Sequence, residues 1–139
     1  MTLSVVVPVY NEAETIVEII ERVRAVDIDK EIIIIDNCST DGTRELVQAM
    51  DFPGLQKIMQ DRNRRKGNSV KKGIAAARGQ YTIIQDGDLE YDPRDYHRLL
   101  NAVRSEGVLA ALGSRVLGMQ ERGEAMPASS FSFGRNLLN

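Results

Sequence analysis

The sequence has 139 residues, 42% of them hydrophobic and 27% charged, which is enough chain for one soluble domain with its own core. A net charge of −2, the lack of tryptophan and an aromatic content of 5% exclude the basic, aromatic surface of a nucleic-acid-binding protein. The single cysteine, Cys38, excludes an internal disulfide and favours a reducing compartment, so we expect a cytoplasmic protein.

The N-terminal residues lead directly into a predicted strand and show no signal-peptide pattern. No apolar run reaches the length that a bilayer-spanning helix needs. We therefore expect any contact with a membrane to be peripheral.

Short apolar runs rich in β-branched residues alternate with helical patterns along the chain. The predicted strands are Leu3–Val7, which Pro8 ends, Glu31–Ile35, Leu55–Met59, Tyr81–Gln85 and Leu109–Leu112. The predicted helices begin at about Ala13, after a cap at Thr40 or Asp41, at Ser69 and at Pro93. This alternation predicts an α/β fold with a mostly parallel, Rossmann-like sheet and helices on both faces.

The last of these helices runs to about Ser105 and is expected to bury an apolar face, while His97 is expected to be partly exposed. The apolar face consists of Tyr96, Leu99, Leu100 and Val103. Beyond Arg115 the periodicity is lost, and residues 117–132 predict a mobile loop before the first turns of another helix at Phe133–Asn139.

An acidic motif, Asp86-Gly87-Asp88, follows the fourth predicted strand, which reads as a buried strand. Carboxylates two residues apart can face the same side, and a hard cation such as Mg²⁺ or Mn²⁺ would relieve their repulsion. The motif therefore indicates a site for a metal and a diphosphate. The alternative is an acidic turn ahead of a helix that begins at Asp92-Pro93.

Two further polar clusters follow predicted strands, Tyr10-Asn11-Glu12 after the first and Asp36-Asn37 after the second. In a parallel sheet the carboxyl ends of strands line one crevice. A basic run lies between the third strand and the next helix and consists of Arg62, Arg64, Arg65 and Lys66. Each cluster alone has an ordinary explanation as a helix cap, an Asx turn or a solvated loop. Together they predict a site for a nucleotide diphosphate.

Five motifs also occur in an order and spacing that resemble the family 2 glycosyltransferases of the GT-A fold. They are Val5-Val6-Val7-Pro8-Val9-Tyr10-Asn11-Glu12, Ile35-Asp36-Asn37-Cys38-Ser39-Thr40-Asp41-Gly42-Thr43, Lys66-Gly67-Asn68, Gln85-Asp86-Gly87-Asp88-Leu89-Glu90-Tyr91-Asp92-Pro93 and Gly113-Ser114-Arg115. Within that family the chain most resembles the dolichol- and polyprenyl-phosphate sugar synthases. The resemblance extends over nearly the whole chain up to Arg115.

The resemblance implies a set of donor-binding residues, which is Pro8, Tyr10, Glu12, Asp36, Asn37, Lys66, Asp86, Gly87 and Asp88. It implies Mn²⁺ or Mg²⁺ as the cofactor, with Asp86, Asp88 and Glu90 as its ligands. Catalytic roles fall to Asp88 and to Arg115, which matches a residue that contacts phosphate where donor and acceptor meet.

This sequence departs from the family pattern at three positions. Asn37 stands where a second acid is usual, which leaves UDP- and GDP-sugars both open as donors. Arg65 replaces the first glycine of a Gly-Lys-Gly motif, which alters the approach to the base or phosphate. Gly87 stands where alanine is common, and its role is either an unusual φ/ψ or a close approach of the sugar.

The resemblance implies a metal-dependent, inverting glycosyltransferase that moves a sugar from a UDP- or GDP-sugar to a polyprenyl phosphate, at the cytoplasmic face of a membrane. A homodimer is compatible with it. No general base is assignable, and a phosphate acceptor is already ionised. We expect residues 1–139 to be one incomplete domain, with 116–139 as the start of an acceptor loop and helix. The alternative is a truncated module that binds nucleotide sugar without turnover.

Overall fold

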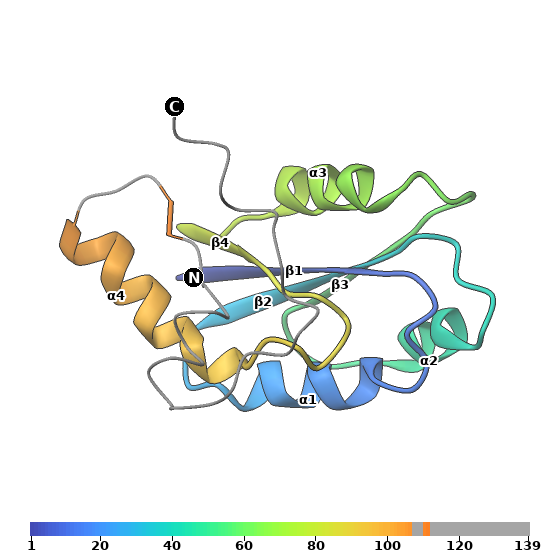
Figure 1. Ribbon diagram of the computed structural model, residues 1–139, viewed down its shortest axis with the longest axis horizontal. Coiled ribbons are helices and arrows are strands. Elements are labelled where there is room, and N and C mark those ends of the chain that lie inside the picture. The colour runs from blue at the N-terminus through green and yellow to red at the C-terminus, as the bar shows by residue number, and fades with distance from the viewer. Residues whose placement is uncertain (107–109, 112–139) are drawn as a thin grey trace, which may run out of the picture. The chain divides into compact units, whose positions relative to one another are not determined.

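The computed structural model describes residues 1–106 and 110–111 (Figure 1). The strands in this part are β1 (Leu3–Val9), β2 (Lys30–Asp36), β3 (Leu55–Met59) and β4 (Tyr81–Ile84). The helices are α1 (Ile16–Ala25), α2 (Thr43–Ala49), α3 (Lys66–Ala76) and α4 (Tyr96–Glu106), with a 3₁₀ turn η1 (Pro93–Asp95) before α4. The chain divides into two compact units, Met1–Leu100 and Asn101–Asn139, and the cavity described below is lined by residues of the first.

All four strands are parallel and lie in the order β3-β2-β1-β4. Val6 of β1 pairs with Ile33 of β2 on one side and with Ile84 of β4 on the other. This confirms the predicted α/β fold. Because the strands are parallel, their carboxyl ends lie along the same edge of the sheet.

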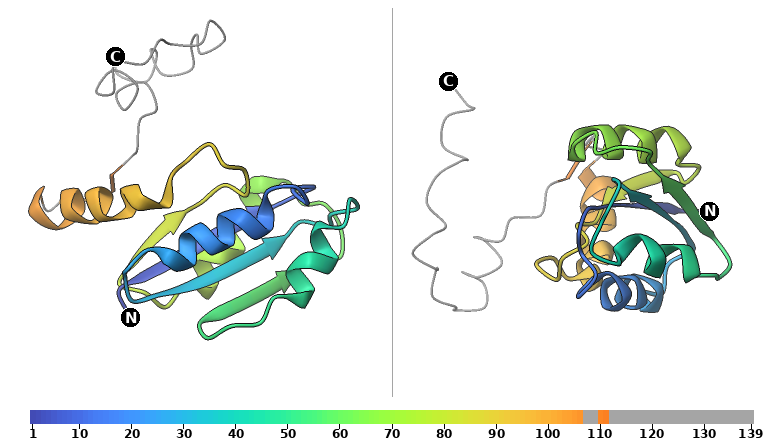
Figure 2. Two further views of the ribbon diagram at one scale, coloured as in Figure 1. Left: turned by 90° about the horizontal axis from the view of Figure 1, so that it is seen from below. Right: turned by 90° about the vertical axis from the view of Figure 1, so that its right-hand side faces the viewer.

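The sheet has an apolar core on each face, as continuous apolar strands require. Val5, Val7 and Val9 face a cluster that contains the buried side of α1, together with Val47 of α2 and Tyr96. The neighbouring residues of β1 and β2 face the opposite way, and α3 packs over them. Figure 2 shows α1 and α2 on one side of the sheet and α3 on the other.

β1 continues through Pro8 to Val9, so the prediction that Pro8 ends the strand is wrong. Alternate residues of β1 hydrogen-bond to opposite neighbours, and Val6 O accepts from Gln85 N on the β4 side at 2.9 Å. Pro8 has the same orientation as Val6, but the ladder with β4 stops at the Val6–Ile84 pair. The missing N–H of proline therefore faces a position where no strand of the described sheet pairs with β1.

Two helix starts differ from the prediction. α1 begins at Ile16 rather than at Ala13, because a turn in which the Glu12 carbonyl accepts from Thr15 N and Ile16 N precedes it. α3 begins at Lys66 rather than at Ser69. The carbonyl of Arg65 accepts from the second and third amides beyond Lys66, so the first helical turn already includes that lysine.

β4 is an edge strand of the described sheet, and it is only half-buried. The exposed fraction of Ile84 is 47%, which contradicts the prediction of a buried strand. The predicted fifth strand Leu109–Leu112 lies outside the described residues except for Ala110 and Ala111, which have no strand assignment. Arg115 and the predicted loop and helix of 116–139 also lie outside them, so the single incomplete domain stays a prediction.

Tyr96 and Leu100 of α4 are buried as predicted, Leu99 and Val103 are half-buried, and His97 is exposed. No helix in the described part of the chain combines the length and the apolar character needed to cross a bilayer.

Candidate functional site

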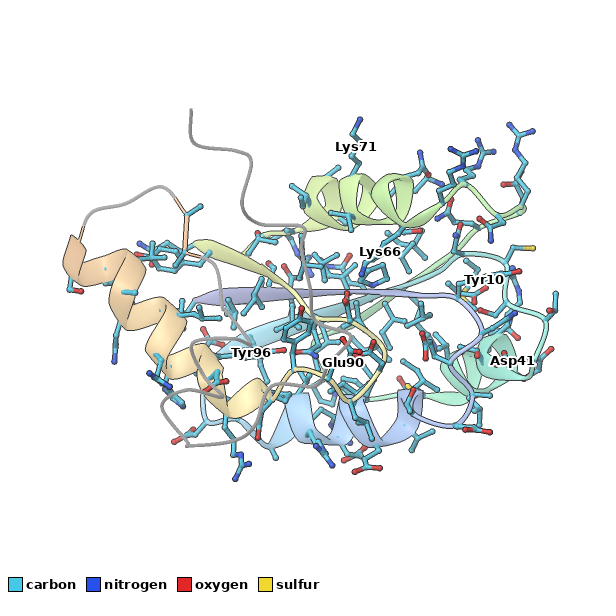
Figure 3. The ribbon with its side chains drawn as sticks, in the orientation of Figure 1. Tyr10, Asp41, Lys66, Lys71, Glu90 and Tyr96 are labelled. Carbon is cyan, nitrogen blue, oxygen red and sulfur yellow. The ribbon has the colours of Figure 1, made fainter. Side chains whose placement is uncertain are left out.

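A cavity of about 290 Å³ lies at the carboxyl ends of β1 and β2, beside the start of α3. Its lining consists of Pro8, Val9, Tyr10, Glu12, Asn37, Asn63, Arg65, Lys66 and Ser69. In Figure 3, Lys66 lies between α3 and the sheet, with Tyr10 toward the end of β1. The fold therefore brings residues from three distant parts of the sequence together around one cavity.

Five of the predicted donor-binding residues line this cavity, namely Pro8, Tyr10, Glu12, Asn37 and Lys66. Sequence reasoning did not assign Asn63 and Ser69 to the site. Both lie within three residues of Lys66, and an asparagine within a basic loop is a typical turn residue, so their positions carried a usable signal.

The loop after β1 is tied to the loop after β2 by hydrogen bonds to backbone groups. Asn11 has a φ of 56°. Its backbone N–H donates to Ser39 Oγ at 3.0 Å, and its side-chain Oδ1 accepts from Thr40 N at 2.9 Å. Glu12 N donates to Thr43 Oγ1 at 2.8 Å. These contacts fix Tyr10, whose exposed fraction is 46%, at the cavity.

Asp36 is buried and does not line the cavity. Its Oδ2 accepts from Arg44 at 2.8 Å and its Oδ1 accepts from Ser39 N at 3.2 Å. Both oxygens thus stabilise the loop that follows β2. The predicted contact of Asp36 with the donor stays a prediction.

Asn37 is joined to the loop before α3. Its Oδ1 accepts from Arg64 N at 2.8 Å, and its Nδ2 donates to Asn63 Oδ1 at 3.0 Å. Asn63 Oδ1 also accepts from Arg65 N at 2.9 Å. Because backbone N–H groups can only donate, they fix the orientation of both side-chain amides. The oxygen of Asn37 that was expected to accept from a base N–H therefore already serves the protein backbone.

The residues that follow β4, from Asp86 to Glu90, form an acidic loop. This loop is joined to the cavity by Lys66. This lysine lines the cavity, and its Nζ forms an ion pair with Asp86 Oδ1 at 2.6 Å. Asp88 Oδ1 accepts from Glu90 N at 3.0 Å, and the Gly87 carbonyl accepts from Thr15 Oγ1 at 2.9 Å. The predicted metal ligands thus follow β4 and lie near the predicted donor cavity, although Asp86 and Asp88 are not part of its lining.

Gly87 is closely packed against the protein. An added Cβ would lie 3.0 Å from Val9 Cγ1 and 3.2 Å from Glu12 Cγ. The two described glycines with positive φ are Gly42 and Gly54, so an unusual φ at Gly87 is not the reason for glycine there. Its close neighbours are Val9 and Glu12.

Negative charge accumulates around the acidic loop. Burial raises the pKa of Glu12, the hydrogen bond from Thr15 lowers it, and the charges of Asp88, Asp41 and Asp86 raise it further, with a raised pKa as the result. Carboxylates that repel one another in this way attract a cation. Lys66, through its ion pair with Asp86, supplies one positive charge to this acidic region.

The carboxylates of the acidic loop suit a hard divalent ion that takes only part of its coordination shell from the protein. Among residues 1–106 and 110–111, no three acidic, histidine or cysteine side chains are close enough to hold an ion by themselves. Mg²⁺ is typically held by one or two carboxylates, waters and substrate phosphates. Asp86 and Asp88 are carboxylates of this kind, and the roles of Asp86, Asp88 and Glu90 as metal ligands stay predictions.

A buried, hydrogen-bonded pair, Tyr96 and Gln85, contacts the backbone of the acidic loop. Tyr96 OH donates to Gln85 Oε1 at 2.7 Å, and both side chains are buried. Gln85 Nε2 donates to the carbonyls of Asp86 at 3.2 Å and Tyr91 at 3.4 Å. Sequence reasoning did not assign this pair, although a glutamine at the end of an apolar run and a tyrosine on an apolar helix face were visible.

Comparison with known proteins gives one family match over nearly the whole chain. The family model described as "Glycosyl transferase family 2" matches residues 4–139. Among curated relatives, the succinoglycan biosynthesis protein ExoO of Rhizobium meliloti is 35% identical over 111 residues, which cover 79% of this chain and 32% of that protein. The dodecaprenyl-phosphate galacturonate synthase of Rhizobium johnstonii is 32% identical over 124 residues, covering 83% of this chain and 36% of that protein. This chain thus spans about a third of the length of the curated relatives it matches.

A solved structure of similar fold is the mannosyltransferase PcManGT of Pyrobaculum calidifontis, in complex with GDP-Man and Mn²⁺. It superimposes with a TM-score of 0.63 at 31% sequence identity, covering 73% of this chain and 31% of the other.

Proposed function

This chain belongs to glycosyl transferase family 2, and on that premise we propose that it transfers a sugar from a UDP- or GDP-sugar to a polyprenyl phosphate. The observation that carries the proposal is the cavity at the carboxyl ends of β1 and β2, with Lys66 between it and Asp86. The name of the galacturonate synthase supports a polyprenyl phosphate as acceptor, and the GDP-Man complex supports a nucleotide sugar as donor.

In this proposal the nucleoside occupies the cavity. Tyr10 offers an exposed ring on which a base can stack, and Asn37 offers the second N–H of its amide as a donor. Pro8 and Glu12 complete the walls near the ribose. Asp36 contributes indirectly, because Arg44 and Ser39 hold it beneath the loop that carries Asn37.

The diphosphate lies toward the acidic loop, where Asp86, Asp88 and Glu90 would hold Mn²⁺ or Mg²⁺. When bound, the ion neutralises charge on the diphosphate leaving group. Lys66 adds a further positive charge at the same place, since its Nζ lies 2.6 Å from Asp86. Gly87 keeps its loop close to Val9 and Glu12.

The reaction forms a bond between an acceptor phosphate oxygen and the anomeric carbon, and it breaks the bond from that carbon to the nucleoside diphosphate. The leaving diphosphate takes the electron pair, so negative charge develops on its oxygens, where Lys66 would stabilise it. Attack from the opposite face inverts the anomeric configuration. A phosphate acceptor is already ionised, so the reaction needs no general base. Arg115 is the proposed contact to phosphate where donor and acceptor meet.

We place this reaction in the cytoplasm at the membrane surface, where a polyprenyl phosphate is presented, with peripheral membrane contact. A homodimer stays a prediction. The family match favours transfer over a module that binds nucleotide sugar without turnover.

A transfer assay tests the proposal. The chain is incubated with labelled UDP- and GDP-sugars, a polyprenyl phosphate and Mn²⁺, and labelled lipid is extracted. We expect labelled lipid with at least one donor and a strong loss on chelation of the metal. Nucleotide-sugar binding without labelled lipid, for every donor tried, would instead favour the binding module.

A further inference from the structure

Arg65 has a backbone conformation that residues other than glycine rarely adopt. Its φ is 67° and its ψ is 157°, in a region of backbone space that is almost exclusive to glycine. An arginine there lowers the stability of the fold, so its presence calls for a role of the side chain.

The backbone of Arg65 is held by hydrogen bonds that do not involve its own side chain. Arg65 N donates to Asn63 Oδ1 at 2.9 Å, and Asn37 Nδ2 donates to the same oxygen at 3.0 Å. The Arg65 carbonyl accepts from Asn68 N at 3.1 Å. Any residue other than proline at position 65 can keep these three contacts, so Arg65→Gly and Arg65→Ala leave the turn in place.

Arg65 lines the cavity and is exposed. Within residues 1–106 and 110–111 its guanidinium has no hydrogen bond or ion pair, unlike Arg64, which lies 3.1 Å from Asp61. Lys66, the other cation of the lining, is paired with Asp86. The guanidinium of Arg65 thus supplies positive charge to the cavity that no described carboxylate neutralises.

We propose that Arg65 binds the diphosphate of the nucleotide, an inference that rests on the proposed function and assigns one further contact to the donor. A guanidinium donates two parallel hydrogen bonds, which match two oxygens of a phosphate. Arg65 is the neighbour in sequence of Lys66, which also lines the cavity and is paired with Asp86. The favourable phosphate contact offsets the strain of an arginine in this conformation.

The proposal predicts that stability and affinity change in opposite directions in one variant. Arg65→Gly relieves the strain, so its melting temperature without ligand should rise by about 2 °C or more. The same variant loses the guanidinium, so its affinity for UDP or GDP should fall about tenfold or more. Arg65→Ala keeps the strain and should show the same loss of affinity without the rise in melting temperature.

Calorimetric titration of the full 139-residue chain with UDP, GDP, uridine and guanosine, all with Mn²⁺, measures these affinities. Arg62→Ala is the matched control, because it removes an exposed arginine of the same loop that does not line the cavity, and it should keep affinity within about twofold. Undiminished diphosphate affinity in Arg65→Gly would overturn the proposal. So would an equal loss of nucleoside affinity, which would place the contact at the base. If the unaltered chain binds neither diphosphate, the proposed function fails as well.

Discussion

Glu31 is a fully buried carboxylate at the start of β2, far along the strand from the cavity at its other end. Burial alone would raise the pKa of Glu31, but hydrogen bonds from Ser4, from Arg78 and from Gln56 outweigh it and lower the pKa to about 2. The distance from Ser4 Oγ is 2.7 Å, and that from Gln56 Nε2 is 2.7 Å. This network joins β2 to β1, to β3 and to the turn before β4.

Glu31→Gln should therefore destabilise the protein in a pH-dependent way. The pKa in the folded state lies below the ordinary value of 4.5, so the ionised group stabilises the fold above about pH 4.5 and loses this effect as the pH falls toward 2. The free energy of unfolding at neutral pH should drop by about 3 kcal/mol, measured by urea denaturation. The difference between the two proteins should shrink between pH 4.5 and 2, and a difference that stays constant over that range would contradict this account.

Asp88→Asn should abolish metal-dependent binding of the donor while leaving the fold intact. The side chain is half-buried, and its described hydrogen bond to Glu90 N can be kept by the amide oxygen. Titration of UDP and GDP with and without Mn²⁺ measures the effect. Asp51→Asn, at an exposed position after α2, is the control for loss of one negative charge. Undiminished Mn²⁺-dependent affinity in Asp88→Asn would remove this residue from the site.

Residue types at the site were predictable from the sequence, but their partners were not. The sequence places Asn37 after a strand, yet its orientation depends on the backbone N–H of Arg64, 27 residues away. Asp36 was an equally good candidate, and its ion pair with Arg44 could not be inferred from the sequence. Hydrogen-bond partners of this kind follow from tertiary packing rather than from local pattern.

α3 lies very close to the sheet at Gly73. An added Cβ there would lie 2.3 Å from Val6 Cγ1 and 2.8 Å from Ile35 Cδ1. Gly73→Ala should therefore destabilise the protein by about 1–3 kcal/mol, although alanine is the better helix former. Gly67→Ala is the matched control in the same helix, since nothing lies within 4 Å of the added Cβ, and it should stabilise the protein by up to about 1 kcal/mol. Thermal or urea unfolding measures both, and equal signs for the two would argue against the close packing of α3.

The Tyr96–Gln85 pair links α4 to the end of β4. Burial raises the pKa of Tyr96, so the phenol stays protonated and can donate to Gln85. Tyr96→Phe leaves the buried amide oxygen without its donor and should cost about 1–3 kcal/mol in urea unfolding. The same change in a Gln85→Met background should cost clearly less, because both polar partners are then gone. Equal costs in the two backgrounds would contradict a direct interaction.

Elements with a strong pattern were predictable to the residue, as β3 at Leu55–Met59 shows. Pro8 was misjudged because its effect depends on which side of β1 carries a neighbour at that point. The burial of Ile84 was misjudged for a similar reason, since an apolar β-branched run does not reveal whether its strand lies at an edge. The effect of Pro8 and the burial of Ile84 both depend on which strands pair with each other, and the local composition does not reveal this pairing.

The parallel sheet is what turns separate sequence motifs into one site. β1, β2 and β4 end along the same edge, so Tyr10, Asn37 and Asp86 follow strands that finish side by side. This part of the site was predictable, because the alternation of strands and helices implies it. The start of α3 at Lys66 was not, and it is this helix that connects the cavity to the acidic loop.

The most direct test is a crystal structure of the chain with Mn²⁺ and UDP or GDP, with anomalous scattering to locate the metal. We predict a manganese peak at bonding distance from carboxylate oxygens of Asp86 or Asp88, with the diphosphate on the same ion and the nucleoside between Tyr10 and Asn37. A nucleotide bound elsewhere, or a manganese peak remote from both carboxylates, would contradict the account.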